Sequence, residues 1–359
     1  MLPSAQTTAP EDGLRITSVL GACRGSSGRH DLRHRLHATA AWGPVLRLQA
    51  GTRVAGVWWS LPVHRKPRVP LAVCAVFKDE AEHLPEWVTF HRLMGVEEFY
   101  LYDNGSTDDW ERALGPELTS RIVRVTPWPA DARVAQLSAY SHCLRRRRHR
   151  ARWIAFLDID EFLFSTSGEP LPQVLAAFDA HPGVIAAWRV YGTGGIAERS
   201  RGLVTETFRW RAREDHFLSA YGKPIVNPRR TSSIVASPHR FNHYERRRPW
   251  RLRGAAVDEK RSPVTSDVCR ASANLLRINH YYSRSVAEAL EKWRRGSVTR
   301  AAPPPLSELL DSKLNEVHDG ILLRVVPELR DRLAERHAGR LSPAAHPMAT
   351  SLPREKSSE

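Results

Sequence analysis

Along the chain, short continuous runs of hydrophobic residues alternate with segments in which hydrophobic residues recur at helical spacing. The apolar runs 71–77, 99–102 and 153–157 have the length of strands that are buried on both faces. Between these runs, apolar side chains recur at three- and four-residue intervals after Leu84 and over 132–144, which predicts helices. Because strands and helices alternate, we expect an α/β fold built on a mixed, mainly parallel sheet flanked by helices.

Beyond residue 180 the pattern predicts a less regular mixture of elements. A capping box formed by Ser285 and Glu288 predicts the start of one helix, and the prolines 303–305 introduce another. A similar spacing of Asp79 and Glu82 predicts the cap of the first helix of the core. The candidate strands are 184–191, 203–210, 233–236 and 275–282, and the helix after the prolines is expected over 306–318.

The two ends of the chain differ from this core. Residues 1–66 are expected to form a separate lead-in with a β-hairpin in its second half, and 67–337 the main domain. Residues 338–359 are rich in Pro, Ser and Ala, so we expect a disordered tail. No stretch approaches the ~20 apolar residues of a membrane span, and the cysteines lack CxxC spacing. We therefore expect a cytoplasmic protein, soluble or peripheral to a membrane.

Charge narrows the choice of partners. The 359 residues include 54 Lys and Arg against 39 Asp and Glu, a net charge of +15, which favours anionic partners. The run Arg145 to Arg152 ends a predicted helix and offers a contact for an anionic membrane. No nucleic-acid motif is present, so nucleic acid is not the expected partner. A basic, non-enzymatic nucleic-acid-binding protein remains an alternative.

An acidic cluster follows the strand 153–157 directly. In open α/β sheets, ligands gather at the carboxyl ends of the strands. Asp158 and Asp160 project to the same side as long as strand geometry lasts, so together they can bind a hard cation such as Mn²⁺ or Mg²⁺. Such a cation would bridge to a diphosphate. A nucleotidyltransferase would use the same acids, but it ordinarily has a glycine-rich phosphate loop, and 78–85 contains no glycine.

Polar side chains also follow the first two strands. Lys78 and Glu80 come after one strand, and Asp103, Asn104 and Ser106 come after the next. Their acceptor groups suit the edge of a nucleobase and the hydroxyls of a ribose. We expect these two loops to form one wall of a nucleotide site.

Several segments along the core carry a family resemblance, and they occur in a fixed order. They are Ala75-Val-Phe-Lys-Asp-Glu-Ala, Glu86-Trp-Val-Thr-Phe-His, Phe99-Tyr-Leu-Tyr-Asp-Asn-Gly-Ser, Trp153-Ile-Ala-Phe-Leu-Asp-Ile-Asp-Glu-Phe, Lys223-Pro-Ile-Val-Asn-Pro, Pro238-His-Arg-Phe, Ile278-Asn-His-Tyr-Tyr-Ser and Lys292-Trp-Arg-Arg-Gly. The combination resembles glycosyltransferase family 92 and its bacterial family-2-like relatives over roughly residues 71 to 320. One departure is Asp79, which stands where relatives often carry Asn.

The resemblance implies a GT-A fold and a hexosyltransferase that uses a nucleotide-sugar donor, with a UDP-sugar expected, and Mn²⁺ or Mg²⁺. The acceptor would be a glycan or glycolipid. Asp158 would face the donor ribose or the metal, Asp160 would bind the metal, and His239 or His280 would complete the metal site. We favour His239 because it follows the segment that holds the candidate base. The residues expected around the donor are Phe77, Lys78, Glu80, Asp103, Asn104, Ser106, Asp158, Lys223 and Arg229.

Transfer with inversion needs a carboxylate that removes the proton of the acceptor hydroxyl. Glu206 and Asp215 are the two candidates for this base. Glu206 matches the family pattern better, whereas Glu214 and Asp215 resemble the acidic pair of other inverting enzymes.

Overall fold

The computed structural model describes residues 67–235, 237–245, 251–295 and 305–338 of the 359-residue chain. The expected hairpin within 1–66 and the expected tail, apart from Ala338, lie outside the described residues. Within the described ranges, no helix is both long enough and apolar enough to cross a membrane.

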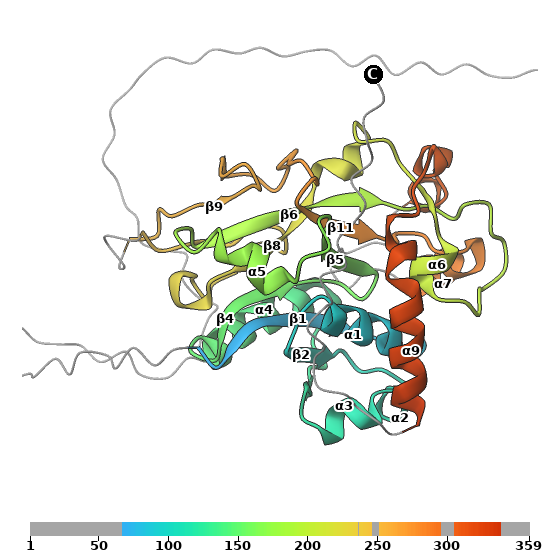
Figure 1. The fold of residues 1–359 in the computed structure, drawn as a ribbon, viewed down its shortest axis with the longest axis horizontal. Coiled ribbons are helices and arrows are strands. Elements are labelled where there is room, and N and C mark those ends of the chain that lie inside the picture. Colours follow the sequence, from blue (N-terminus) through green and yellow to red (C-terminus); the bar gives the residue numbers. More distant parts are fainter. Residues whose placement is uncertain (1–66, 236, 246–250, 296–304, 339–359) are drawn as a thin grey trace, which may run out of the picture. The chain divides into compact units, whose positions relative to one another are not determined.

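Parallel strands form the first half of the central sheet (Figure 1). They are β1 (Val69–Phe77), β2 (Glu98–Asp103), β3 (Val123–Pro127) and β4 (Ala151–Phe156), in the spatial order β4-β1-β2-β3. Cys74 of β1 lies opposite Tyr100 of β2 and Phe156 of β4. With this register, the carboxyl ends of β1, β2 and β4 meet at one edge of the sheet.

The second half of the sheet is mixed. Antiparallel β8 (Gly222–Val226) joins β4 to β6 (Gly183–Val190), and β11 (Leu276–His280) runs parallel to β6. Because β8 runs against β4, the first residues of β8 lie at the carboxyl edge and its last residues at the opposite edge. The remaining strands are β5 (Glu161–Ser165), β9 (Ala256–Val257) and β10 (Pro263–Val264), with a separate pair β7 (Trp210–Arg211) and β12 (Val317–His318).

Helices cover both faces of the sheet. Alternate residues of β1 point to opposite faces, so Val73 packs in the cluster that contains Trp87 of α1 (Leu84–Leu93). Cys74 packs on the other face with Tyr140 of α4 (Ala132–Arg147). The other helices are α2 (Trp110–Ala113), α3 (Gly115–Thr119), α5 (Leu171–Ala176), α6 (Val204–Thr207), α7 (Val286–Arg295), α8 (Leu306–Leu309) and α9 (Val326–His337), with 3-10 turns η1 (Phe217–Ala220), η2 (Pro228–Arg230), η3 (Ser312–Asn315) and η4 (Ile321–Arg324).

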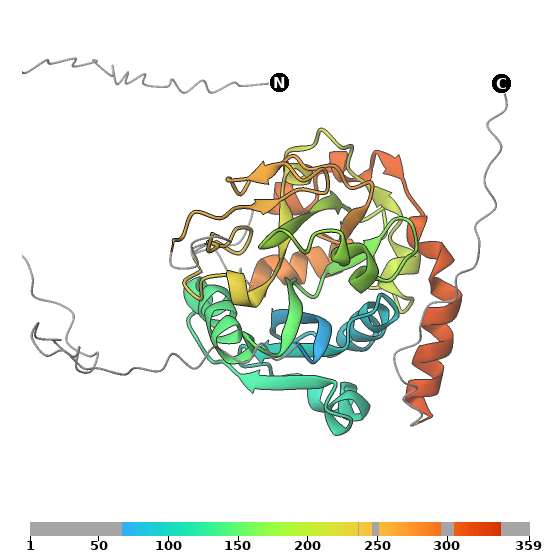
Figure 2. The same cartoon turned by 60° about the vertical axis from the view of Figure 1, so that its left-hand side comes forward.

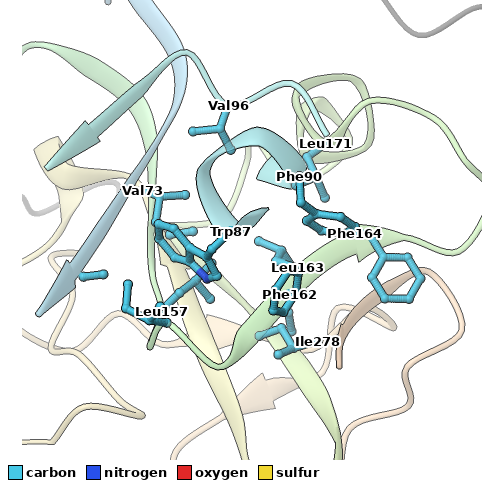
Figure 3. Close-up of a cluster of buried hydrophobic side chains, with 14 of the residues drawn as sticks. Val73, Trp87, Phe90, Val96, Leu157, Phe162, Leu163, Phe164, Leu171 and Ile278 are labelled. Carbon is cyan, nitrogen blue, oxygen red and sulfur yellow. The ribbon is translucent and has the colours of Figure 1, made fainter. Parts of the chain in front are cut away.

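The larger cluster of apolar side chains joins α1 to the strand that follows the acidic segment (Figure 3). Trp87, Phe90 and Phe162 are fully buried there, and burial of such a side chain contributes roughly 1.5–3 kcal/mol. The indole Nε1 of Trp87 also donates a hydrogen bond to the carbonyl oxygen of Glu161, at 2.8 Å. These contacts hold the backbone of the acidic segment against α1.

The observed architecture is the mixed, mainly parallel α/β sheet that the sequence predicts, but several elements differ. The strand expected over 203–210 is wrong, because α6 and β7 occupy that range. No strand forms over 233–235, and the helix expected over 306–318 is replaced by α8, η3 and β12. Several elements were not predicted, among them β3, β5, β8 and the C-terminal helix α9, which stands beside α1 at one side of the molecule (Figure 2).

Tertiary hydrogen bonds explain why α6 forms and why one predicted capping box does not. The carboxylate of Glu86, in the first turn of α1, accepts hydrogen bonds from the amides of Val204 at 2.7 Å and Thr205 at 3.0 Å, which caps α6. The predicted Asp79–Glu82 capping box does not form, since Asp79 Oδ1 accepts from the Thr107 amide at 2.7 Å. In contrast, the capping box of Ser285 and Glu288 is present at the start of α7.

Candidate active site

The loops after β1 and β2 lie side by side at the carboxyl edge. The Asp79 amide donates to Ser106 Oγ at 3.0 Å, and the Ala81 amide donates to Asp108 Oδ2 at 2.6 Å. Asp79 has a φ of 53°, a left-handed backbone that costs a non-glycine residue about 1–3 kcal/mol. The structure therefore brings together the two loops that the sequence assigns to the nucleotide.

Several side chains expected at the donor hold these loops in shape. Asp103 Oδ1 accepts a hydrogen bond from the Ser106 amide at 2.8 Å. The amide group of Asn104 donates to the carbonyl oxygens of Trp128 and Ala130, at 2.8 and 2.9 Å. Asn104 is buried, so its structural contacts account for its presence in this loop.

The acidic segment itself is a turn. β4 ends at Phe156, and the Glu161 amide donates to the carbonyl oxygen of Asp158 at 3.1 Å. Strand alternation therefore does not extend through residue 160, and the carboxylates of Asp158 and Asp160 bind different partners. The expectation that strand geometry places both acids on one side is wrong.

Asp158 is paired with a lysine inside the protein. Lys223, at the start of β8, is 1% exposed, and its Nζ lies 2.8 Å from Asp158 Oδ2. Asp158 Oδ1 accepts a further hydrogen bond from Gln136 of α4 at 2.6 Å. Burial alone would lower the pKa of Lys223, but the charge of Asp158 raises it. Lys223 therefore remains a cation at neutral pH.

Glu161, next to this pair, is fully buried. Burial raises the pKa of Glu161 well above its usual range, and the 3.7 Å separation of its Oε2 from Lys223 Nζ is too long for a strong ion pair. Its Oε2 accepts from the Asp158 amide at 3.0 Å. Burial and the nearby carboxylates of Asp158 and Asp160 thus favour the protonated form of Glu161, against the opposing effects of Lys223 and the Asp158 amide.

Asp160 lies between a lysine and a histidine. Lys292 Nζ donates to Asp160 Oδ2 at 2.7 Å, and His280 Nε2 lies 3.4 Å from Asp160 Oδ1. Burial alone would raise the pKa of Asp160, but the charges of Lys292 and His280 hold it well below its usual range. Asp160 is therefore a carboxylate throughout the physiological pH range.

A cavity of about 320 Å³ opens beside Asp160. The loop after β1 lines it with Glu80, and the segment from β11 into α7 lines it with Tyr282, Arg284 and Lys292. Arg284 and Lys292 were not among the residues predicted for the site. Two signals could have indicated them: the capping box directly after Arg284, and the motif segment that begins at Lys292.

The two candidate histidines differ in their contacts. His280 Nε2 faces Asp160, and its buried Nδ1 has no hydrogen-bond partner among the described residues. His239 Nδ1 instead lies 2.9 Å from the carbonyl oxygen of Gly222. Burial, with the charge of Lys223, lowers the pKa of His239 to about 4. The structure thus places His280 beside Asp160, and the preference for His239 as the metal ligand has no support from these contacts.

Two residues of the chain fit a divalent cation. In the described part of the chain, no group of three or more His, Cys, Asp and Glu side chains could hold a metal ion by itself. A carboxylate and an imidazole nitrogen, as Asp160 and His280 offer, suit Mn²⁺. Mg²⁺ commonly binds through one or two carboxylates and completes its shell with phosphate oxygens and water. The residues present therefore fit a cation that arrives with a diphosphate.

Neither predicted base lines the cavity beside Asp160. The carboxylate of Glu206, in α6, forms an ion pair with Arg330 of α9. Asp215 is exposed, and its Oδ1 lies 3.4 Å from Arg213 Nε. Neither Glu206 nor Asp215 is therefore among the residues that line this cavity.

Of the other residues predicted to contact the donor, Arg229 lies away from the cavity beside Asp160, and Phe77 is buried in the core. Arg229 lies in η2 and lines a second cavity, of about 240 Å³, together with Arg152 and Asp179. Arg152 stands near the amino end of β4, so the expected contact of Arg229 with the donor is wrong. Phe77 is 2% exposed and packs edge-on against Trp110, while Lys78 is half-buried beside it.

Solved structures with some similarity include two complexes with uridine nucleotides. One is residues 1–349 of S. aureus TarS in complex with UDP, at 12% identity and a TM-score of 0.29, with 44% of this chain and 46% of that chain covered. Another is glucosyl-3-phosphoglycerate synthase from Mycobacterium tuberculosis in complex with Mn²⁺ and UDP-glucose, at 19% identity and a TM-score of 0.23, with 34% and 44% covered. TM-scores this low do not establish a common fold.

Sequence relatives give a clearer result. A glycosyltransferase family 92 protein of Oryza sativa subsp. japonica is 30% identical over 184 residues, which is 50% of this chain and 30% of that protein. Another, of Ricinus communis, is 25% identical over 295 residues, which is 74% of this chain and 48% of that protein. The chain thus spans less than half the length of these relatives. Residues 69–291, well over half of the chain, match the profile of glycosyltransferase family 92. The chain belongs to glycosyltransferase family 92.

Proposed function

We propose that the chain is a metal-dependent glycosyltransferase of the GT-A type. It transfers a hexose from a nucleoside diphosphate donor, a UDP-sugar, to a hydroxyl group of a glycan or glycolipid, with inversion at the anomeric carbon. The observation that carries the proposal is the arrangement around Asp160. This carboxylate lies at the carboxyl edge of the sheet, beside a cavity that is also lined by the cations Arg284 and Lys292.

Each group at this edge has a role in holding the donor. Asp160 and His280 would hold Mn²⁺ or Mg²⁺, which when bound offsets the negative charge of the departing diphosphate. Arg284 and Lys292 bind diphosphate oxygens through charge-assisted hydrogen bonds. The ion pair of Asp158 with the buried Lys223 fixes the turn that carries Asp160.

The loops after β1 and β2 would receive the nucleoside. Glu80 lines the cavity from the first loop, and Asp103 shapes the second through its bond to the Ser106 amide. An acceptor hydroxyl would attack the anomeric carbon while a base removes its proton and the diphosphate leaves. Glu206 and Asp215 do not line this cavity, so we assign the base to neither residue.

Calorimetry of UDP binding with and without Mn²⁺ tests the proposal. Asp160→Asn removes a charged ligand, and we expect Mn²⁺-dependent UDP affinity to fall at least about 100-fold, a loss of about 2.7 kcal/mol. Asp331→Asn, an exposed aspartate of α9, is the matched control and should bind as the wild type does. Equal UDP affinity in Asp160→Asn and wild type would exclude a metal site at Asp160.

The histidines provide a second comparison. His280→Ala should weaken Mn²⁺ binding, because His280 Nε2 is close to Asp160 Oδ1. His239→Ala should leave Mn²⁺ affinity within about threefold of wild type, and should lower the melting temperature because it removes a buried hydrogen bond. Loss of Mn²⁺ binding in His239→Ala alone would restore the ligand favoured by the sequence.

We further propose that the end of α4 contacts an anionic membrane from the cytoplasmic side. Within 145–152 several arginines are engaged internally: Arg148 donates to the carbonyl oxygen of Thr231, and Arg150 pairs with Glu98. Arg145 and Arg146 are exposed in the last turn of the helix. These two side chains support the proposed contact with lipid phosphates.

A further inference from the structure

Lys292 and a metal ion would compete for the negative charge of Asp160. Its Nζ donates to Asp160 Oδ2 at 2.7 Å and to the carbonyl oxygen of Tyr282 at 2.9 Å. The other oxygen of this carboxylate, Oδ1, lies 3.4 Å from His280 Nε2. A divalent cation bound to either oxygen of Asp160 would therefore be repelled by the ammonium group of Lys292 until that group moves away.

Lys292 can leave its carboxylate at far lower cost than Lys223 can. The side chain of Lys292 is 29% exposed, and its Nζ lies 4.6 Å from the ring centre of Tyr282 at the cavity wall. Lys223 is 1% exposed and enclosed by the sheet. An ammonium group in contact with solvent is rehydrated when it leaves its carboxylate, whereas a buried ammonium group would be left with an uncompensated charge away from water. Lys292 is thus the exchangeable partner and Lys223 the fixed one.

Arg284 adds a second cation to the same wall of the cavity. Its backbone has a φ of 55°, a left-handed conformation that is costly for an arginine. Arg284 Nη1 lies 3.3 Å from Glu80 Oε2, and its Nε is buried without a hydrogen-bond partner among the residues described. The guanidinium is therefore held by Glu80 at the cavity that Lys292 also lines.

We infer that Lys292 is an exchangeable counter-ion, which holds Asp160 until a divalent cation and a nucleoside diphosphate bind together and then passes to the diphosphate beside Arg284. The inference rests on the proposed function and adds a thermodynamic coupling to it. Mn²⁺ alone would leave the charge of Lys292 without its carboxylate. When the diphosphate is present, Lys292 gains new anionic partners, so each ligand strengthens the binding of the other.

Mn²⁺ titrations with and without UDP, followed by calorimetry and by the paramagnetic signal of free Mn²⁺, test this coupling. In wild type, UDP should increase Mn²⁺ affinity about tenfold or more. Lys292→Met frees Asp160, so affinity for Mn²⁺ alone should rise about tenfold. In the same variant, affinity for UDP in the presence of Mn²⁺ should fall by a similar factor, because one diphosphate ligand is lost.

Two variants control the comparison. Lys292→Arg keeps the positive charge, so its affinity for Mn²⁺ alone should stay as low as that of wild type. Lys260→Met changes an exposed lysine in the turn after β9, and should alter neither affinity. Melting temperatures identify any variant that does not fold. If Lys292→Met is one of these, Lys292→Gln makes the same measurement with a polar side chain.

The outcomes separate the inference from the proposed function. If wild type binds UDP with Mn²⁺ but Lys292→Met binds Mn²⁺ alone no more tightly than wild type, the exchange is refuted and the proposed function stands. A wild-type protein that binds neither UDP nor Mn²⁺ refutes both. Higher Mn²⁺ affinity in both Lys292→Met and Lys292→Arg would show that the charge of Lys292 is not the cause, and would also overturn the inference.

Discussion

The docking of α9 depends on a buried ion pair, and its removal should destabilise the whole domain. Arg336 is 7% exposed and donates from Nε to Glu117 Oε1 at 2.7 Å and from Nη2 to Oε2 at 3.0 Å. Glu117, in α3, is 1% exposed. The profile match ends at residue 291, so α9 lies outside it. The ion pair thus tests whether this helix is an integral part of the fold.

Arg336→Met should cost about 3–5 kcal/mol, because it removes the cation that is hydrogen-bonded to the buried carboxylate of Glu117. At about 2–4 °C per kcal/mol for a domain of this size, the melting temperature should fall by about 6–20 °C. Thermal unfolding followed by circular dichroism at neutral pH measures the change.

The double variant Arg336→Met/Glu117→Leu removes both charges and provides the control. Replacing a buried ion pair by apolar side chains of similar size is often neutral or stabilising, so we expect the double variant to unfold within about 1 kcal/mol of wild type. A single variant Arg336→Met that melts at the wild-type temperature would refute the reasoning, since the pair would then hold nothing that the fold needs.

Two further predictions concern pH and membranes. Burial alone would raise the pKa of Glu288, but hydrogen bonds from His83 and Ser285 hold it at about 2, below its ordinary value near 4.5. The stability that this carboxylate contributes is therefore present above pH 4.5 and is lost as the pH falls toward 2. The variant Glu288→Gln should be less stable than wild type at neutral pH, and the difference in unfolding free energy should shrink between pH 4.5 and 2 when unfolding is measured as a function of pH. Replacing Arg145 and Arg146 by Glu should weaken binding to phosphatidylglycerol vesicles at low salt by at least about 30-fold, taking about 1 kcal/mol per arginine, as measured by co-sedimentation. Binding to phosphatidylcholine vesicles should not change, and unchanged binding to phosphatidylglycerol vesicles would exclude this contact.

Much of the sheet could be predicted from local pattern. The segments that form β1, β2 and β4 are continuous apolar runs, because a strand that is buried on both faces needs apolar side chains at successive positions. The start of α7 was also predicted, since the Ser285 and Glu288 bonds join residues three positions apart. Such features depend on neighbours in the sequence and can be seen in it directly.

The elements that sequence reasoning missed depend on distant partners. α6 is only four residues long, and its amides are capped by Glu86, 118 positions away from Val204. α9 has few apolar positions of its own and is anchored through Arg336 to Glu117, 219 positions away. Neither contact leaves a periodic signal in the local sequence.

The sequence by itself determined that an acidic segment would follow a buried strand and that two polar loops would meet it at the same edge. This follows because parallel strands bring their carboxyl ends together. Only the tertiary structure decided the partner of each acid: Lys223 for Asp158, 65 positions away, and Lys292 for Asp160, 132 positions away. The antiparallel register of β8 against β4 and the packing of α7 beside the cavity set these pairs, and no local pattern encodes the distance between residues so far apart in the chain.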